Sequence, residues 1–92
     1  MLINKLKMKN NGGNTMTIRQ QVNELLKEIK PTKDLSTVTD IIEGGYLDSF
    51  ELMSLIASLC DTFGIEIGVD DIIPENFNSL DAIVSMVEGL KA

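Results

Sequence analysis

Apolar side chains recur at helical spacing in three stretches of the chain, with polar residues between them. Within each stretch the apolar positions lie mostly three or four residues apart, so they share one face of an α-helix. The pattern predicts three amphipathic helices that bury these faces against one another. The predicted buried faces are Ile18, Val22, Leu25, Leu26 and Ile29; Leu52, Leu55, Ile56, Leu59 and Phe63; and Leu80, Ile83, Val84, Val87 and Leu90.

The first and last helices have clear start signals. Thr17 and Gln20 have the spacing of a capping box, in which each side chain bonds the other residue's backbone N–H. Pro31 ends the first helix because proline disfavours helix at the residue before it and has no N–H to donate. The last helix is predicted to begin near Ser79, with Asn78 or Ser79 as its N-cap.

A long loop, residues 31–47, connects the first two helices. Its apolar side chains are too numerous for a solvated linker, so we expect them to pack across the bundle, with a single turn near Thr39–Glu43. A loop of this length in a small domain usually covers a core or has a function. The apolar residues are Leu35, Val38, Ile41, Ile42 and Leu47.

The second connection contains the short helical element. Gly64 is placed to end the middle helix, and residues 65–69 are predicted to be extended. Either Asp70 and Asp71 cap a short helical piece that reaches Pro74, or Pro74 takes the first position of a new turn. The predicted fold is therefore all-α, a small up-and-down bundle of three principal helices plus one short helix.

Composition limits the chemistry that the chain can carry out. Its 92 residues suffice for one domain with one small core. It contains no histidine, the commonest general base and metal ligand. Cys60 is the single cysteine, so no internal disulfide can form, and we interpret it as a core or boundary residue. We expect no metal site, even at the neighbouring carboxylates Asp70 and Asp71, and no enzymatic activity.

Charge is divided unevenly along the chain. Residues 1–33 carry seven basic and two acidic side chains, net +5, whereas residues 34–92 carry one basic and twelve acidic, net −11. The acidic part repels nucleic acid and favours basic protein surfaces, although ordinary solubility explains it equally well. With no apolar run of membrane-spanning length and no secretory signal, we expect a cytoplasmic protein without a membrane span.

The first fifteen residues show no apolar period. The run 10–14, Asn-Asn-Gly-Gly-Asn, is typical of a flexible segment. We therefore predict that residues 1–15 are a disordered basic leader and that residues 16–92 form the domain. The alternative is that the leader is a short basic arm that contacts a partner.

A turn runs directly into the middle helix and places a serine at its first position. The glycine pair 44–45 permits a tight or left-handed backbone, and Asp48 with Glu51 has the spacing of a capping box. The helix is predicted from Ser49 to about Thr62. The Ser49 hydroxyl then lies at the positive end of the helix dipole, which suits an attached or bound phosphate. The alternative is that Ser49 is only a second capping candidate.

The segment Leu47-Asp48-Ser49-Phe50 resembles the 4′-phosphopantetheine attachment motif of acyl and peptidyl carrier proteins. The resemblance extends from about Thr17 to Leu90, in the family's order of helix, long loop, motif helix, short helical segment and last helix. The stretch Glu75-Asn76-Phe77 resembles the stand-alone carriers nearest the D-alanyl, aminoacyl or peptidyl type.

This resemblance implies that a phosphopantetheinyl transferase attaches 4′-phosphopantetheine from coenzyme A to Ser49, with magnesium, while Asp48 caps the helix and helps to position the transferase. The arm's thiol then holds an acyl or aminoacyl group as a thioester for downstream acyl-accepting enzymes. Residues 16–92 are the carrier domain in this interpretation, and we expect a monomer. The alternative function is a small helical protein-interaction module without a prosthetic group.

Partner contacts are expected on the exposed face of the motif helix. Phe50, Met53 and Ala57 lie off the buried stripe and form an apolar strip beside the motif serine, and the resemblance adds Glu51 as a contact. The helix has only two acidic residues, Glu51 and Asp61, whereas the family's fatty-acid members have a strongly acidic motif helix. This departure favours a dedicated adenylating acyl or aminoacyl ligase as the loading partner.

Overall fold

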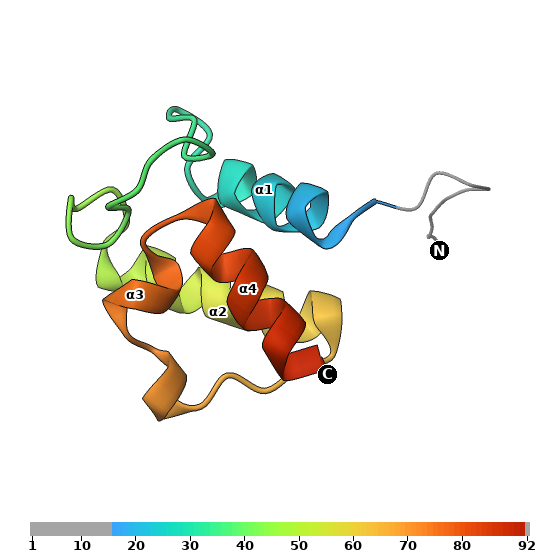
Figure 1. The fold of residues 1–92 in the computed structure, drawn as a ribbon. Helices are drawn as coiled ribbons and strands as arrows, with labels where there is room; N and C mark the ends of the chain where they lie inside the picture. Colours follow the sequence, from blue (N-terminus) through green and yellow to red (C-terminus); the bar gives the residue numbers. More distant parts are fainter. Residues whose placement is uncertain (1–15, 92) are drawn as a thin grey trace.

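The computed structural model describes residues 16–91, which contain four α-helices and one 3₁₀ turn and no strand (Figure 1). The elements are α1 (Ile18–Ile29), α2 (Ser49–Phe63), the 3₁₀ turn η1 (Val69–Asp71), α3 (Pro74–Phe77) and α4 (Leu80–Lys91). The all-α bundle of three principal helices and a short one is therefore confirmed. The prediction of a disordered leader concerns residues 1–15, which lie outside the described residues.

Local capping sets the starts of α1 and α2 as the sequence predicts. At α1 the Gln20 N–H donates to Thr17 Oγ1 at 3.0 Å, and the Thr17 N–H donates to Gln20 Oε1 at 2.8 Å. At α2 the Glu51 N–H donates to Asp48 Oδ1 at 2.7 Å, and the Asp48 N–H donates to Glu51 Oε1 at 3.0 Å. α2 ends at Phe63, one residue later than expected, and Gly64 follows it in the left-handed conformation, at φ 64°, as the sequence predicts.

The three long helices bury their apolar faces together. α1 packs against both α2 and α4, and α3 packs against α4. α1 and α2 run in opposite directions, as the colours of Figure 1 show. Leu52, predicted on the buried face of α2, is only partly buried, whereas Leu55 and Leu59 are fully enclosed. The buried core consists of Val22, Leu26, Leu35, Ile41, Leu47, Leu55, Ile56, Leu59, Ile65, Phe77, Leu80, Ile83, Val84, Met86 and Val87.

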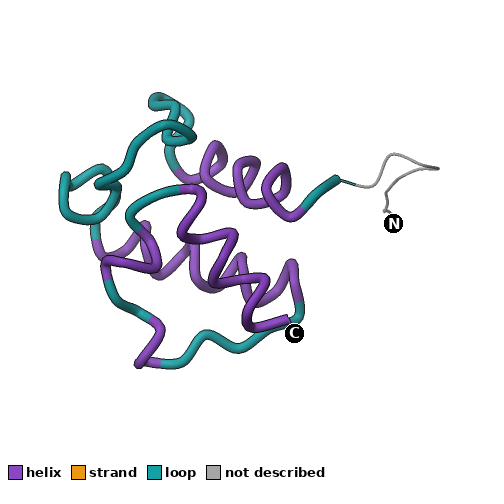
Figure 2. Tube along the Cα trace, viewed as in Figure 1, coloured by secondary structure: helices purple, strands orange, loops and turns teal. Residues whose placement is uncertain are grey.

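The long loop contributes to this core, as its composition predicts. Leu35, Ile41 and Leu47 are buried, although Figure 2 shows no helix between α1 and α2. The turn predicted near Thr39–Glu43 lies slightly later, at residues 40–46, and shorter turns occur at residues 31–32 and 36–37. The turn includes both glycines of the pair 44–45, and Gly45 has a left-handed φ that glycine adopts readily.

The structure of the connection between α2 and α4 decides two points that the sequence left open, the role of Pro74 and the N-cap of α4. Pro74 takes the first position of α3, where its missing N–H is harmless. Asp71 lies inside the preceding 3₁₀ turn and accepts a hydrogen bond from the Gly68 N–H at 3.1 Å. Ser79 rather than Asn78 caps α4, because the Ala82 N–H donates to Ser79 Oγ at 3.0 Å. Asn78 is thereby free to bind the long loop.

Candidate functional site

Ser49 is an exposed residue at the first position of α2. The first helical hydrogen bond runs from the Leu52 N–H to the Asp48 carbonyl at 2.9 Å, so the Ser49 and Phe50 N–H groups precede the helical ladder. The Asp48 carboxylate is directed to the Glu51 N–H, as described above. The serine hydroxyl is therefore at the surface, beside backbone donors at the positive end of the helix dipole.

The turn before Ser49 requires both of its glycines. Gly45 has φ 76°, a left-handed conformation that other residues rarely adopt. A Cβ on Gly44 would lie 2.6 Å from the Asp40 carbonyl oxygen, too close for any side chain. Beyond the turn Leu47 is buried, and the next three residues are exposed. The chain is thus anchored inward at Leu47 immediately before it presents Ser49 to solvent.

Two lysines from the end of α1 and the following loop lie near the start of α2. Lys30 Nζ lies 3.2 and 3.3 Å from the two carboxylate oxygens of Glu51. Lys33 Nζ lies 5.5 Å from the centre of the Tyr46 ring, within the range of a cation–π contact. These contacts cannot be predicted from the sequence, because nothing in it shows which residues of α2 the end of α1 will meet.

The residues predicted to contact partners divide into two groups. Phe50 and Met53 are exposed by 79% and 55%, and Ala57 is exposed on the same side of α2 as Met53. Glu51 differs, because its side chain is only 24% exposed and its carboxylate is held by the Asp48 N–H and by Lys30. The structure thus brings the apolar strip together beside Ser49. Binding of a partner to any of these residues stays a prediction.

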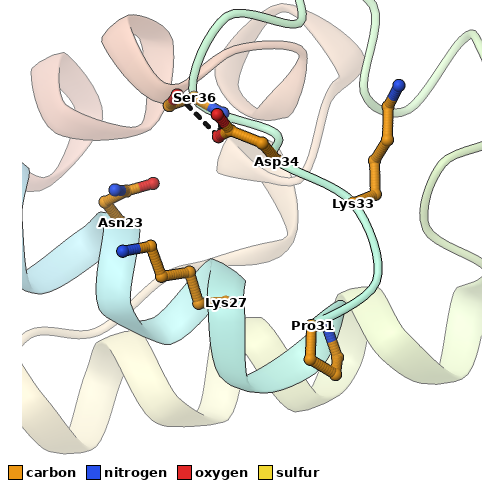
Figure 3. Close-up of a pocket in the computed structure, with 6 residues that line it drawn as sticks. All are labelled: Asn23, Lys27, Pro31, Lys33, Asp34 and Ser36. Atoms are coloured by element: carbon orange, nitrogen blue, oxygen red, sulfur yellow. Dashed lines mark hydrogen bonds between the residues drawn. The ribbon is translucent and has the colours of Figure 1, made fainter.

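A shallow hollow lies between α1 and the long loop (Figure 3). Within it Asp34 Oδ1 accepts hydrogen bonds from the Ser36 hydroxyl at 2.7 Å and the Ser36 N–H at 3.0 Å, and these hold the pKa of the Asp34 carboxyl below its usual range. None of the predicted site residues lines the hollow. Its lining is Asn23, Lys27, Pro31, Lys33, Asp34 and Ser36.

The chemistry available around Ser49 is that of a hydroxyl group on a surface. Among residues 16–91, no three His, Cys, Asp or Glu side chains lie close enough together to hold a metal ion. Cys60, on α2, is half-buried, as expected for a boundary residue. No helix in the described part of the chain has the length and apolar character needed to cross a membrane.

The structure is thus a small helical bundle that displays a serine at the start of a helix. The family model described as phosphopantetheine attachment site matches residues 17–87, and the chain belongs to this family. Its prosthetic group is 4′-phosphopantetheine. Ser49 fits this group because its hydroxyl is exposed and the start of α2 offers backbone N–H groups to a phosphate.

Proposed function

We propose that Ser49 is the residue that carries 4′-phosphopantetheine. The observation that carries this proposal is the position of Ser49, exposed at the first turn of α2 directly after Asp48, within the segment matched by the family. Attachment to the hydroxyl would place the phosphate beside the first N–H groups of the helix, where negative charge is stabilised. Asp48, whose carboxylate caps the helix, would keep the serine at this first position.

The attached arm would supply a thiol that holds an acyl or aminoacyl group as a thioester. The chain's own residues then present the arm and provide a surface that partner enzymes recognise. The expected partners are a phosphopantetheinyl transferase that uses coenzyme A, an adenylating ligase and the downstream enzymes that accept the acyl group. We expect the carrier to act as a cytoplasmic monomer.

The exposed residues of α2 favour a ligase that binds the carrier through apolar contacts. Of its two acidic residues, Glu51 is occupied by Lys30, and Asp61 is twelve residues beyond Ser49, about 18 Å along the helix axis. Next to Ser49, the exposed side chains of Phe50 and Met53 are apolar. A partner that depends on an acidic motif helix, as in fatty-acid synthesis, would find little charge to bind here.

The test is the intact mass of the protein after reaction with a broad-specificity phosphopantetheinyl transferase and coenzyme A. We expect the wild type to gain one phosphopantetheinyl group and Ser49→Ala to gain none while keeping its helical circular dichroism. Ser85→Ala removes an exposed serine from α4 and should be modified like the wild type. Modification of Ser49→Ala would contradict the assignment. An unmodified wild type would favour the interaction module without a prosthetic group.

A further inference from the structure

Asn78, at the junction between α3 and α4, makes four hydrogen bonds to a single turn of the long loop. Its carbonyl oxygen accepts from the Ile41 N–H at 2.8 Å. Its side-chain Oδ1 accepts from the Ile42 N–H at 3.0 Å and from the Glu43 N–H at 3.2 Å, and its Nδ2 donates to Glu43 Oε1 at 3.0 Å. From these contacts we infer that Asn78 is a positioning residue that fixes how Ser49 is presented for modification. The inference rests on the proposed function.

The turn needs an external partner because of its own geometry. The carbonyls of Asp40, Ile41 and Ile42 accept hydrogen bonds from residues 44–46 within the turn. The N–H groups of residues 41–43 have the position of the first N–H groups of a helix, which have no partner inside it. Asn78 supplies acceptors for all three, across 35 residues of sequence in the case of Glu43. It therefore caps this turn as an N-cap residue caps a helix.

The position of the turn connects this cap to Ser49. The turn ends immediately before Leu47, which is buried, and Asp48, which caps α2. Without the Asn78 side chain, the N–H groups of Ile42 and Glu43 would lose their acceptor, and the turn would be held only through the Ile41 N–H and the backbone carbonyl of residue 78. α2 would persist, because its capping box and buried face do not involve Asn78. We therefore expect the turn before Ser49 to become mobile while the rest of the domain stays folded.

The contact with Glu43 provides a specific chemical test. In Asn78→Asp the side chain keeps an acceptor for the two N–H groups but places a second carboxylate against Glu43. The double variant Glu43→Gln/Asn78→Asp exchanges the amide and the carboxylate, so that the glutamine can donate to the aspartate. If Asn78 merely filled space, these two variants would behave alike. If it is a hydrogen-bonded cap, the double variant should behave more like the wild type than Asn78→Asp does.

The experiment measures kcat and KM for phosphopantetheinyl transfer, together with amide hydrogen exchange at residues 41–43. Asn76→Ala is the matched control, because Asn76 lies two residues away and donates a single hydrogen bond, to the Asp71 carbonyl at 2.8 Å. For Asn78→Ala we expect kcat to fall by about tenfold or more, since misplacement of a reacting group by about 1 Å has a large effect on rate. KM should change little, because the strip of Phe50 and Met53 is intact.

We expect fast exchange at residues 42 and 43 in Asn78→Ala, a smaller increase in Asn78→Asp, which keeps an acceptor but is repelled by Glu43, and recovery of both exchange protection and kcat in the double variant. Wild-type kcat in Asn78→Ala, or equal loss in Asn76→Ala, would overturn the inference. Should Asn78→Ala fail to fold, absence of rescue by the double variant would also overturn it. If the wild type is never modified, the proposed function fails together with the positioning role, whereas slow exchange in the variants would show separately that Asn78 does not hold the turn.

Discussion

At the scale of single residues, neighbours along α2 have different surroundings. Ser49 and Phe50 face solvent, whereas the carboxylate of Glu51 is engaged by its own chain, through the Asp48 N–H and Lys30. A partner that bound Glu51 would have to displace Lys30 or share the carboxylate with it. Met53 has no such competition, since it is an exposed apolar side chain one turn beyond Ser49.

We therefore predict that Met53→Glu lowers the rate of loading by the cognate adenylating ligase about tenfold or more, because a few apolar anchors usually contribute most of the binding energy. Its stability to urea should be unchanged, since Met53 is 55% exposed. Thr62→Glu adds the same charge at an exposed position near the other end of α2 and should load normally. Equal loading of Met53→Glu and the wild type would remove Met53 from the interface.

Glu51→Gln is predicted to load better than Met53→Glu. Its amide oxygen can still accept the Asp48 N–H, and the lost ion pair with Lys30 is partly exposed, so the change in unfolding free energy should be about 0–1 kcal/mol. Loading kinetics at low and high salt provide the measurement. If Glu51→Gln is the more damaging variant, or if wild-type loading collapses at high salt, recognition is electrostatic.

At the scale of the helix, the buried face of α2 includes fewer residues than the apolar pattern of its sequence predicts. Leu55 and Leu59 are fully buried in the middle and second half of the helix, whereas Leu52, in its first turn, is only partly covered. Ser49 and Phe50, in the same first turn, are exposed. The opposite face of the helix, with Met53, is left for contacts outside the domain.

This difference predicts unequal effects of truncation. Leu59→Ala should lower the free energy of unfolding by about 2–5 kcal/mol, because it leaves a cavity at a site with 0% exposure. Leu52→Ala should cost less, since its side chain already contacts solvent. Urea denaturation of both variants measures the difference. A loss below about 1 kcal/mol for Leu59→Ala would mean that the buried face of α2 is wrongly assigned.

At the scale of the whole molecule, two ion pairs among the described residues join the basic first part of the chain, residues 1–33, to the acidic remainder. Arg19 pairs with Asp81 at the start of α4, and Lys30 pairs with Glu51 at the start of α2. Both link helices that also share the apolar core. The uneven distribution of charge along the sequence is thus partly compensated within the fold. Among the described residues, 16–91, the buried core runs from Val22 to Val87.

A chain that begins at Met16 is therefore predicted to melt and to load like the full chain. The reason is that residues 1–15 are largely polar and have no apolar period, so we expect them to contribute nothing to the core. Thermal melting and loading kinetics of the two chains test this. Normal melting with impaired loading would make the basic segment a contact with the partner, and impaired melting would make it part of the fold.

The sequence by itself determined the three principal helices, the caps of α1 and α2 and the position of Ser49 at a helix start. The partners of a capping box are three residues apart, as in Thr17 with Gln20 and Asp48 with Glu51, so helix geometry alone brings them together. Gly64 and Pro74 act through their own backbone properties, which require no distant neighbour. The features that the sequence predicts correctly are therefore those that depend on residues close together in the chain.

Tertiary structure alone decided which distant groups meet around the site. Asn78 has the residue type of an N-cap, and in the sequence α4 was its nearest use, yet it caps the turn before Ser49 instead. The contact of Lys30 with Glu51 and the partial exposure of Leu52 were equally hidden. Such contacts depend on how the helices and loops are placed relative to one another. The apolar pattern predicts which residues are buried, but the hydrophobic effect is non-directional and does not specify which residues meet.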